Sequence, residues 1–152
     1  MDITIIDFEP VYAADFLRLN IEWLHKYELT EPADISMLEN YQSEILDTGG
    51  CIFLAKAADE IVGSAALIQD KPGEFELAKM AVTANWQGKG ISKLLMEKCL
   101  VKAKELAATK VFLVSSSKLN TALSLYEKYG FKHVQVIENH YTNADIRMEL
   151  VL

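Results

Sequence analysis

The chain has 152 residues, of which 51% are hydrophobic and 24% charged, and its formal net charge is −7. That charge argues against nucleic acid as a partner, because neutralising a phosphate backbone requires clustered Lys and Arg. The acidic start Met1-Asp2 and the absence of an apolar run of about 18 residues predict neither a signal peptide nor a membrane span. Cys51 and Cys99 lie in apolar contexts without metal or redox spacing. We therefore expect one cytoplasmic globular domain covering residues 1–152.

Apolar periodicity predicts the first five elements. They are a strand over residues 2–8, a helix over 10–27, a second helix from Pro32 to the Gly49-Gly50 pair, and strands over 51–57 and 61–68. Proline suits the first turn of a helix, and glycine commonly ends one, so both limits of the second helix have a physical basis.

Lys71-Pro72-Gly73-Glu74 opens the second half, with proline and glycine at the centre as a type II turn prefers. The elements expected after it are a strand over 74–82, a helix from 91 to about 108, a strand over 110–115, a helix to 129 that Gly130 ends, and strands over 131–137 and 145–152. The central strand–helix–strand unit should be a right-handed parallel crossover. The prediction is an α+β fold with a mixed sheet and helices on both faces.

The segment Gln87-Gly88-Lys89-Gly90-Ile91-Ser92 forms a basic loop between a predicted strand and a predicted helix. Free backbone amides at the positive end of a helix suit a pyrophosphate. The spacing is not the Gly-x-Gly-x-x-Gly of a dinucleotide fold, and it lacks the following Ser or Thr of a P-loop. A third kind of phosphate-binding turn is therefore predicted.

Two segments together resemble the GNAT N-acetyltransferase superfamily. Met80-Ala81-Val82 followed by residues 87–92 resembles its acetyl-CoA motif, and residues 125–131, Leu-Tyr-Glu-Lys-Tyr-Gly-Phe, resemble its C-terminal motif. Ser92 departs from the glycine or alanine that is usual in the family loop. The resemblance implies a mixed sheet of six to seven strands whose parallel central strands splay apart to admit acetyl-CoA.

The resemblance also implies which residues hold the cosubstrate. These are Met80, Ala81, Val82, Gln87, Gly88, Lys89, Gly90, Ile91 and Ser92, with Asn120 and Tyr126 from the following helix. Leu119 stands where the family often has asparagine, and its neighbour Asn120 is the substitute candidate. No metal is expected, because the three histidines lack metal-ligand spacing.

Tyr126 and Glu76 are the candidate catalytic residues. Tyr126 matches the family tyrosine that protonates the departing CoA thiolate. Glu76 lies five residues before Ala81, where several histone-acetylating members carry a basic glutamate. An amine of pKa ~10.4 must lose a proton before it attacks, at a cost of about 4.6 kcal/mol at neutral pH. A water relay is the alternative base, and a core tyrosine and a solvated strand glutamate are the structural alternatives.

By the same resemblance, the first two helices and the loop between the last strands should form the acceptor pocket. The candidates are Glu22, Trp23, Tyr27 and Tyr141, with Glu31, His140 and Asp145 in the same regions. Carboxylates beside aromatic rings suit a cationic amine. A small-molecule or peptide amine is thus the expected partner, and homodimers are common among relatives.

The resemblance leads to an acetyl-CoA-dependent N-acetyltransferase that works by direct attack in a ternary complex. Three alternatives stay open at this stage. The enzyme would use another acyl donor or a protein N-terminus as acceptor, the domain would bind CoA as a non-catalytic sensor, or it would be purely structural.

Overall fold

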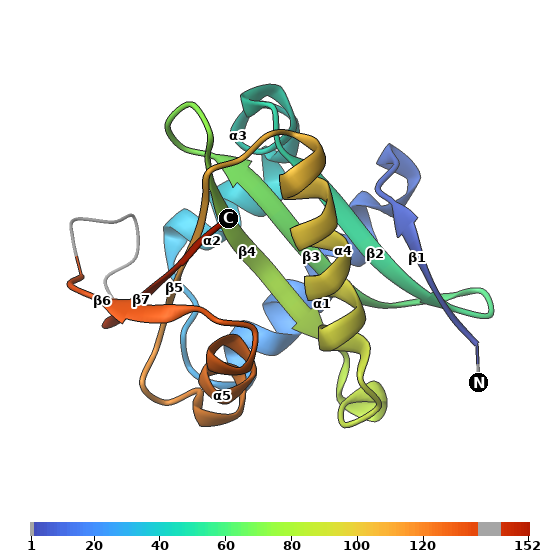
Figure 1. Ribbon diagram of the computed structural model, residues 1–152. Helices are drawn as coiled ribbons and strands as arrows, with labels where there is room; N and C mark the ends of the chain where they lie inside the picture. The colour runs from blue at the N-terminus through green and yellow to red at the C-terminus, as the bar shows by residue number, and fades with distance from the viewer. Residues whose placement is uncertain (1, 137–143) are drawn as a thin grey trace.

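The protein, described by a computed structural model over residues 2–136 and 144–152, is built on one seven-stranded sheet (Figure 1). The strand order is β1-β2-β3-β4-β5-β7-β6. The strands are β1 Ile3–Asp7, β2 Cys51–Ala57, β3 Glu60–Gln69, β4 Glu74–Val82, β5 Lys110–Ser115, β6 Lys132–Val134 and β7 Ile146–Val151. β4 and β5 pair in parallel, and the other neighbours pair antiparallel. The predicted mixed sheet is confirmed.

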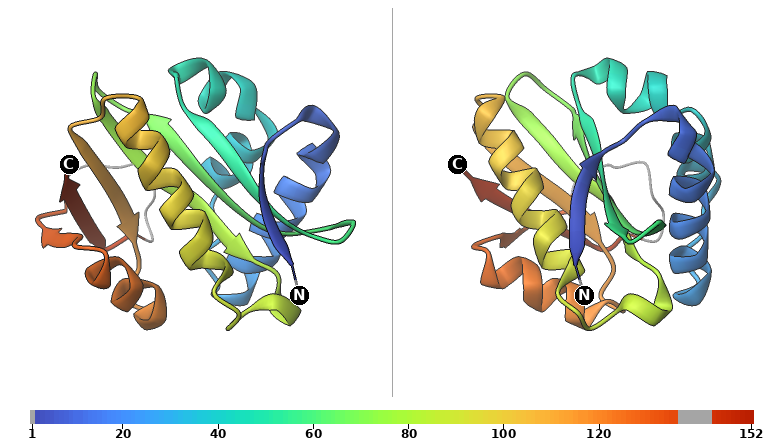
Figure 2. Two further views of the ribbon diagram at one scale, coloured as in Figure 1. Left: turned by 45° about the vertical axis from the view of Figure 1, so that its right-hand side comes forward. Right: turned by 90° about the vertical axis from the view of Figure 1, so that its right-hand side faces the viewer.

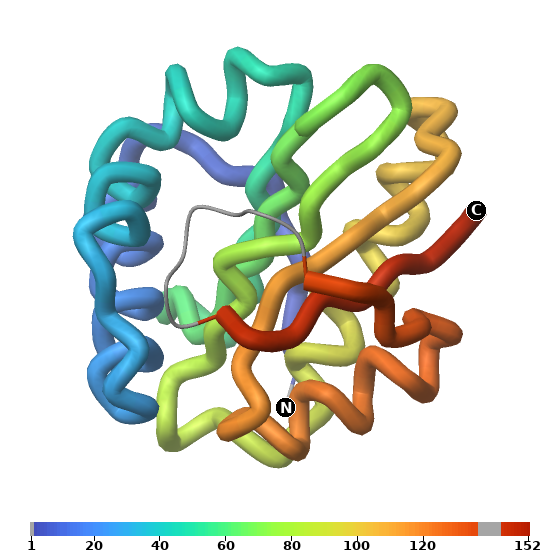
Figure 3. Tube along the Cα trace, turned by 90° about the vertical axis from the view of Figure 1, so that its left-hand side faces the viewer, coloured from blue at the N-terminus to red at the C-terminus, as the bar shows by residue number. Residues whose placement is uncertain are grey.

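Helices cover both faces of the sheet, as the two edge-on views show (Figures 2 and 3). One face carries α1 Ala13–Lys26 and α2 Pro32–Glu39, and the other carries α4 Ile91–Glu105 and α5 Asn120–Lys128. The shorter helical segments are η1 Pro10–Tyr12, α3 Tyr41–Glu44, η2 Leu46–Thr48 and η3 Ala84–Trp86. In the described parts of the chain, no helix is both long enough and apolar enough to cross a membrane.

Two apolar cores flank the sheet. Leu95, Met96 and Cys99 of α4 pack on the side chains of one face, whereas Phe16 and Leu19 of α1 pack on the other. All five side chains are at most 1% exposed. The sheet is thus held between two dry layers, and this rigid support positions the polar groups described below.

The expectation of one helix from Pro32 to Gly49 is wrong. The segment breaks at Asn40, whose φ of −106° and ψ of 38° are not helical. The Asn40 Nδ2 donates a hydrogen bond to the Ser36 carbonyl at 3.0 Å, so the side chain competes with the backbone pattern of a continuing helix. The helix predicted from residue 91, which is α4, also ends early, at Glu105 instead of about residue 108, because Ala107 adopts a φ of +58°.

β4 departs from regular pairing on both of its edges. Toward β3 the register shifts between Ser64 and Ala66, opposite Lys79, which adopts a φ of +54°. Toward β5 the ladder covers only the three residues Glu74, Phe75 and Glu76. Beyond Glu76 the two parallel strands separate, which Figure 2 shows as their diverging carboxyl ends. The implied splay of the central strands is present.

Candidate active site

Two adjacent cavities lie where β4 and β5 separate. The larger cleft, of about 620 Å³, is bounded by the 87–92 loop and the start of α5. The smaller cavity, of about 120 Å³, is bounded by α1, the start of α2, β4 and the end of β5. Both are lined by Trp23, Met80, Leu119 and Tyr126. A molecule in the larger cleft can therefore meet one in the smaller cavity at these four residues.

The 87–92 loop takes its shape from two glycines. Gly88 and Gly90 have φ values of +76° and +81°, a region that other residues rarely adopt. A Cβ at either position would meet nothing within 4 Å, so the backbone conformation and not space requires glycine. Gly90 is the N-cap of α4, and no side chain caps that helix. The first amides of α4 are thus available to an anion at the positive end of the helix.

Most of the residues predicted to hold the cosubstrate line the larger cleft: Met80, Ala81, Val82, Gln87, Gly88, Gly90, Ile91, Ser92, Asn120 and Tyr126. Lys89 is exposed and is not among the lining residues. Lys93 and Lys118 line the cleft and bring positive charge to it. The sequence reading missed Lys118, although its place just before a helix that faces the loop was a usable signal.

Side chains of α1 form hydrogen bonds with the chain between β4 and α4. Gln87 donates to the Val82 carbonyl at 3.0 Å and accepts a hydrogen bond from Lys26 Nζ at 3.0 Å. Glu22 Oε1 accepts from Thr83 Oγ1 at 2.9 Å and from the Ala84 amide at 3.1 Å. The Glu22 carboxylate therefore holds the turn after β4, and Glu22 is not a lining residue of either cavity.

Two aromatic residues of the predicted acceptor region do reach the cavities. Trp23 lines both, whereas Tyr27 lines only the larger cleft. Their ring centroids lie 5.0 Å apart, so the two rings support each other. Tyr141 and His140 lie outside the described residues. Asp145 accepts hydrogen bonds from the Ser117 amide and hydroxyl at 2.8 and 2.7 Å, and thereby fixes the loop before α5.

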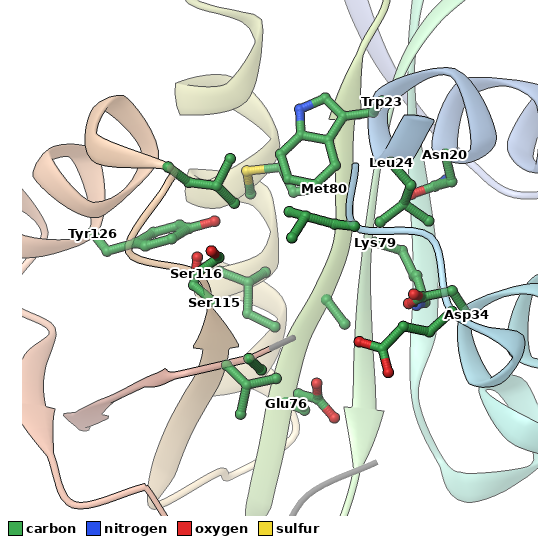
Figure 4. Close-up of a pocket in the computed structure, with 17 residues that line it drawn as sticks. Asn20, Trp23, Leu24, Asp34, Glu76, Lys79, Met80, Ser115, Ser116 and Tyr126 are labelled. Carbon is green, nitrogen blue, oxygen red and sulfur yellow. The ribbon is translucent and has the colours of Figure 1, made fainter. Parts of the chain in front are cut away.

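Glu76 is a buried carboxylate on the wall of the smaller cavity. Its side chain is 9% exposed and projects into the cavity (Figure 4). Burial raises the pKa of Glu76 to about 7, and the nearby Lys79 ammonium opposes the rise. Among residues 2–136 and 144–152, it has no hydrogen-bond or ion-pair partner. A carboxylate in this state can accept a proton near neutral pH.

A buried polar network holds β4 in its irregular shape beside Glu76. Lys79 Nζ lies 2.7 Å from Asp34 Oδ1, with the two side chains 6% and 7% exposed. Ser64 Oγ donates to the Lys79 carbonyl at 2.7 Å, and Asn20 Nδ2 donates to Ser64 Oγ at 3.1 Å. The network fixes both the side chain and the carbonyl of Lys79, and thereby the direction of Met80 at the junction of the two cavities.

Tyr126 lies on α5, across the smaller cavity from Asp34 (Figure 4). Its hydroxyl points into the cavity, and burial raises the pKa of Tyr126 to about 12. The hydroxyl therefore stays protonated and can act as a donor at neutral pH. The structure thus brings both predicted catalytic residues, Tyr126 and Glu76, to one cavity.

Comparisons with known proteins agree with this geometry. Residues 24–152 match the family model for an acetyltransferase (GNAT) domain. N-acetylaspartate synthetase of Xenopus tropicalis is 34% identical over 118 residues, which are 77% of this chain and 43% of that protein. The ribosomal protein bS18-alanine N-acetyltransferase of Haemophilus influenzae is 34% identical over 83 residues, covering 55% and 56%. The chain spans about half the length of these curated relatives.

Two solved structures share the fold. A GNAT-family acetyltransferase from Staphylococcus aureus superposes with a TM-score of 0.90 at 22% identity, over 97% of this chain and 98% of that chain. The PaiA N-acetyltransferase of Thermoplasma acidophilum, solved in complex with coenzyme A, gives 0.80 at 18% identity over the whole of both chains. Together with the family match over residues 24–152, these findings place the chain in the GNAT acetyltransferase family.

Proposed function

We propose that this chain is an N-acetyltransferase that transfers the acetyl group of acetyl-CoA directly to an amine. The observation that carries the proposal is the meeting of the two cavities at Trp23, Met80, Leu119 and Tyr126. One cavity offers an anion site and the other a buried base. This arrangement suits two substrates bound at once, and no nucleophilic side chain is needed between them.

The residues of the larger cleft fit acetyl-CoA. The uncapped amides at the start of α4 suit its pyrophosphate, and Lys93 and Lys118 add positive charge beside them. The edge of β4 beyond Glu76 lacks β5 as a partner, so backbone groups of Met80, Ala81 and Val82 are left to bind the extended arm of the cosubstrate. The same amides suit the negative charge that develops on the thioester oxygen.

Glu76 and Tyr126 account for the protons. An ammonium acceptor carries three N–H bonds and the amide product retains one, so two protons must leave the nitrogen. Glu76 takes one and passes it to solvent, which produces the neutral amine that attacks the thioester carbon. The Tyr126 hydroxyl gives its proton to sulfur as the carbon–sulfur bond breaks. The second proton of the nitrogen restores the proton that Tyr126 has lost. Tyr126 is an assisting acid, because a thiol of pKa ~8.5 already leaves readily.

Thiol release from acetyl-CoA, measured against a library of amines, tests the proposal, and Tyr126→Phe tests the acid. We expect this substitution to lower kcat by about 10-fold and to leave acetyl-CoA affinity unchanged, since phenylalanine keeps the ring and lacks only the hydroxyl group. Tyr129→Phe is the matched control, because Tyr129 lies on the next turn and its hydroxyl bonds Glu97 at 2.7 Å on the surface. An unchanged kcat for Tyr126→Phe would remove this residue as the acid.

A further inference from the structure

Gly63 is a buried glycine in the interior of β3. Glycine weakens the interior of a strand, and it often marks a place where another part of the structure approaches closely. The φ of Gly63 is not positive, so the backbone conformation would admit another residue. Gly63 therefore differs from Gly88 and Gly90 of the 87–92 loop, whose positive φ values are the reason for glycine there.

Lack of space explains the glycine at position 63. A Cβ at this position would lie 3.1 Å from Ile91 Cγ2, 3.2 Å from Leu95 Cδ1 and 3.3 Å from Ala55 Cβ. Carbon atoms in favourable contact are about 3.5–4.0 Å apart, so all three distances are too short. The three neighbours are at most 1% exposed and belong to one core. The helix α4 therefore approaches β3 this closely because Gly63 has no side chain.

The close approach lies at the end of α4 that faces the larger cleft. Ile91 is the first residue of α4, and Leu95 lies one turn further along the helix. Ile91 also lines the larger cleft, next to the N-cap Gly90. A methyl group on Gly63 would push this first turn away from the sheet. The free amides of the turn would move with it, because they belong to the same rigid backbone.

The same part of β3 holds the end of β4. Gly63 pairs with Val82 in the antiparallel ladder, and the Val62 carbonyl accepts a hydrogen bond from the Thr83 amide at 2.9 Å. Val82 is the last residue of β4, and its backbone is part of the edge proposed to bind the extended arm of acetyl-CoA. Two adjacent residues of β3 thus fix both the end of β4 and the start of α4.

We propose that Gly63 is a positioning residue of the donor site, which keeps the start of α4 at the distance from β4 that acetyl-CoA requires. The inference rests on the proposed binding of the pyrophosphate at the start of α4. Gly63 lines neither cavity, so its effect passes through Ile91 and Leu95. Gly88 and Gly90 serve this site through backbone conformation, and Gly63 serves it through the side chain that it lacks.

Gly63→Ala tests the inference with CoA and pantetheine as probes, because both contain the extended arm and only CoA carries the pyrophosphate. We expect the Kd of CoA, measured by calorimetry, to rise about 10-fold. The Kd of pantetheine, measured by NMR titration, should stay within about 2-fold of the wild-type value. An unchanged Kd of CoA, or equal increases for both probes, would overturn the inference. Failure of the wild-type chain to bind CoA would instead overturn the proposed donor site.

Ala103→Val is the matched control for overpacking. Ala103 is fully buried in the same core, lies toward the other end of α4 and lines neither cavity. The added methyl groups should lower the Tm, as Gly63→Ala does, and leave the Kd of CoA unchanged. If Ala103→Val weakens CoA binding as much as Gly63→Ala, packing anywhere along α4 controls affinity, and the inference fails.

The double variant Gly63→Ala/Leu95→Val adds one carbon atom to the contact and removes one from it. Such volume-conserving changes are tolerated best in a core, so we expect the Tm to recover and the Kd of CoA to return to within about 3-fold of the wild-type value. Recovery of the Tm without recovery of affinity would overturn the inference. If neither Gly63 variant folds, Gly63 serves the core alone, and the inference is equally overturned.

Discussion

The two cavities differ in the groups that line them, which are mainly backbone in one and side chains in the other. The larger cleft presents backbone: two glycines with positive φ, the uncapped start of α4, and the edge of β4 without a partner strand. The smaller cavity presents side chains that α1, α2, β4, β5 and α5 bring together. Backbone groups recognise a phosphate whatever the neighbouring side chains are, whereas a wall of side chains can change its charge with each substitution. In the proposed function, the donor site therefore depends on backbone features, and the acceptor site depends on the side chains of this particular chain.

The two cavities also differ in charge. Lys93 and Lys118 line the larger cleft, whereas the described residues that line the smaller cavity include three carboxylates and one ammonium. A protein with a net charge of −7 can therefore hold a polyanion, because the positive potential is local. The contrast predicts that substitutions in the smaller cavity act through side-chain charge, and that substitutions in the larger cleft act through backbone conformation.

Asp34→Ala should have the largest effect on stability. It leaves the Lys79 ammonium buried without its closest carboxylate, which typically costs about 3–5 kcal/mol of unfolding free energy. Chemical denaturation measures the change. The double variant Asp34→Ala/Lys79→Met should recover most of the loss, because neither charge of this pair then remains buried. Asp15→Ala is the exposed control, since its ion pair with Arg18 at 3.3 Å is worth about 0–1 kcal/mol. Equal losses for Asp34→Ala and Asp15→Ala would contradict the buried pair.

Ser64→Ala should have the next largest effect. It removes the donor to the Lys79 carbonyl and the acceptor of Asn20, at a cost of about 1–3 kcal/mol. Because Ser64 lines neither cavity, a fall in kcat of about 10-fold with unchanged acetyl-CoA affinity would show that the hydroxyl positions Met80 through the bulge. Ser36→Ala removes an exposed hydroxyl that donates a hydrogen bond to Glu44 at 3.1 Å, and it should change neither the free energy of unfolding nor kcat. Full activity in a destabilised Ser64→Ala would assign the network to folding alone.

Gly90→Ala should have the smallest of these effects, and of the two substrates it should weaken only the binding of acetyl-CoA. An L-residue at a φ of +81° is strained by roughly 1–2 kcal/mol, so acetyl-CoA binding measured by calorimetry should weaken by about 10-fold. The matched control is Gly73→Ala in the turn between β3 and β4, where φ is +79° and no cavity is near. Gly73→Ala should lower stability and leave affinity intact. Equal affinities for the two variants would show that the backbone of the 87–92 loop does not hold the donor.

The same division explains what the sequence could predict. β4 and β5 were predicted with the bounds that the structure has, because turn signals and apolar patterns are local. The glycines of the 87–92 loop likewise allowed a phosphate-binding turn to be predicted from the sequence. Most residues that line the larger cleft lie in two stretches of chain, residues 80–93 and 118–126, so most of them followed from the two motifs.

The acceptor side depends on contacts that no local pattern reveals. Lys79 adopts a positive φ, but no glycine at this position indicates it in the sequence. The side chains that hold Lys79 lie 15 or more residues away in the chain and are Asn20, Asp34 and Ser64. Asp34 reads in the sequence as an ordinary acid in the first turn of a helix. The Glu22 carboxylate could bind a cation, yet in the folded chain it accepts hydrogen bonds from the turn after β4. Residue type alone could not separate these two carboxylates.

The most direct test of the central claim, that Glu76 removes the proton from the amine, is the pH dependence of kcat/KM for wild type and Glu76→Gln. Only the ionised carboxylate can accept a proton, so wild-type kcat/KM should rise as pH increases through about 7. It should rise again near pH ~10.4, where the ammonium of the acceptor loses its proton. Glu76→Gln should lose the lower rise, keep the upper one and fall by about 100-fold at neutral pH. The same rise through pH 7 in both proteins, or an equal loss at every pH, would contradict a basic role for Glu76.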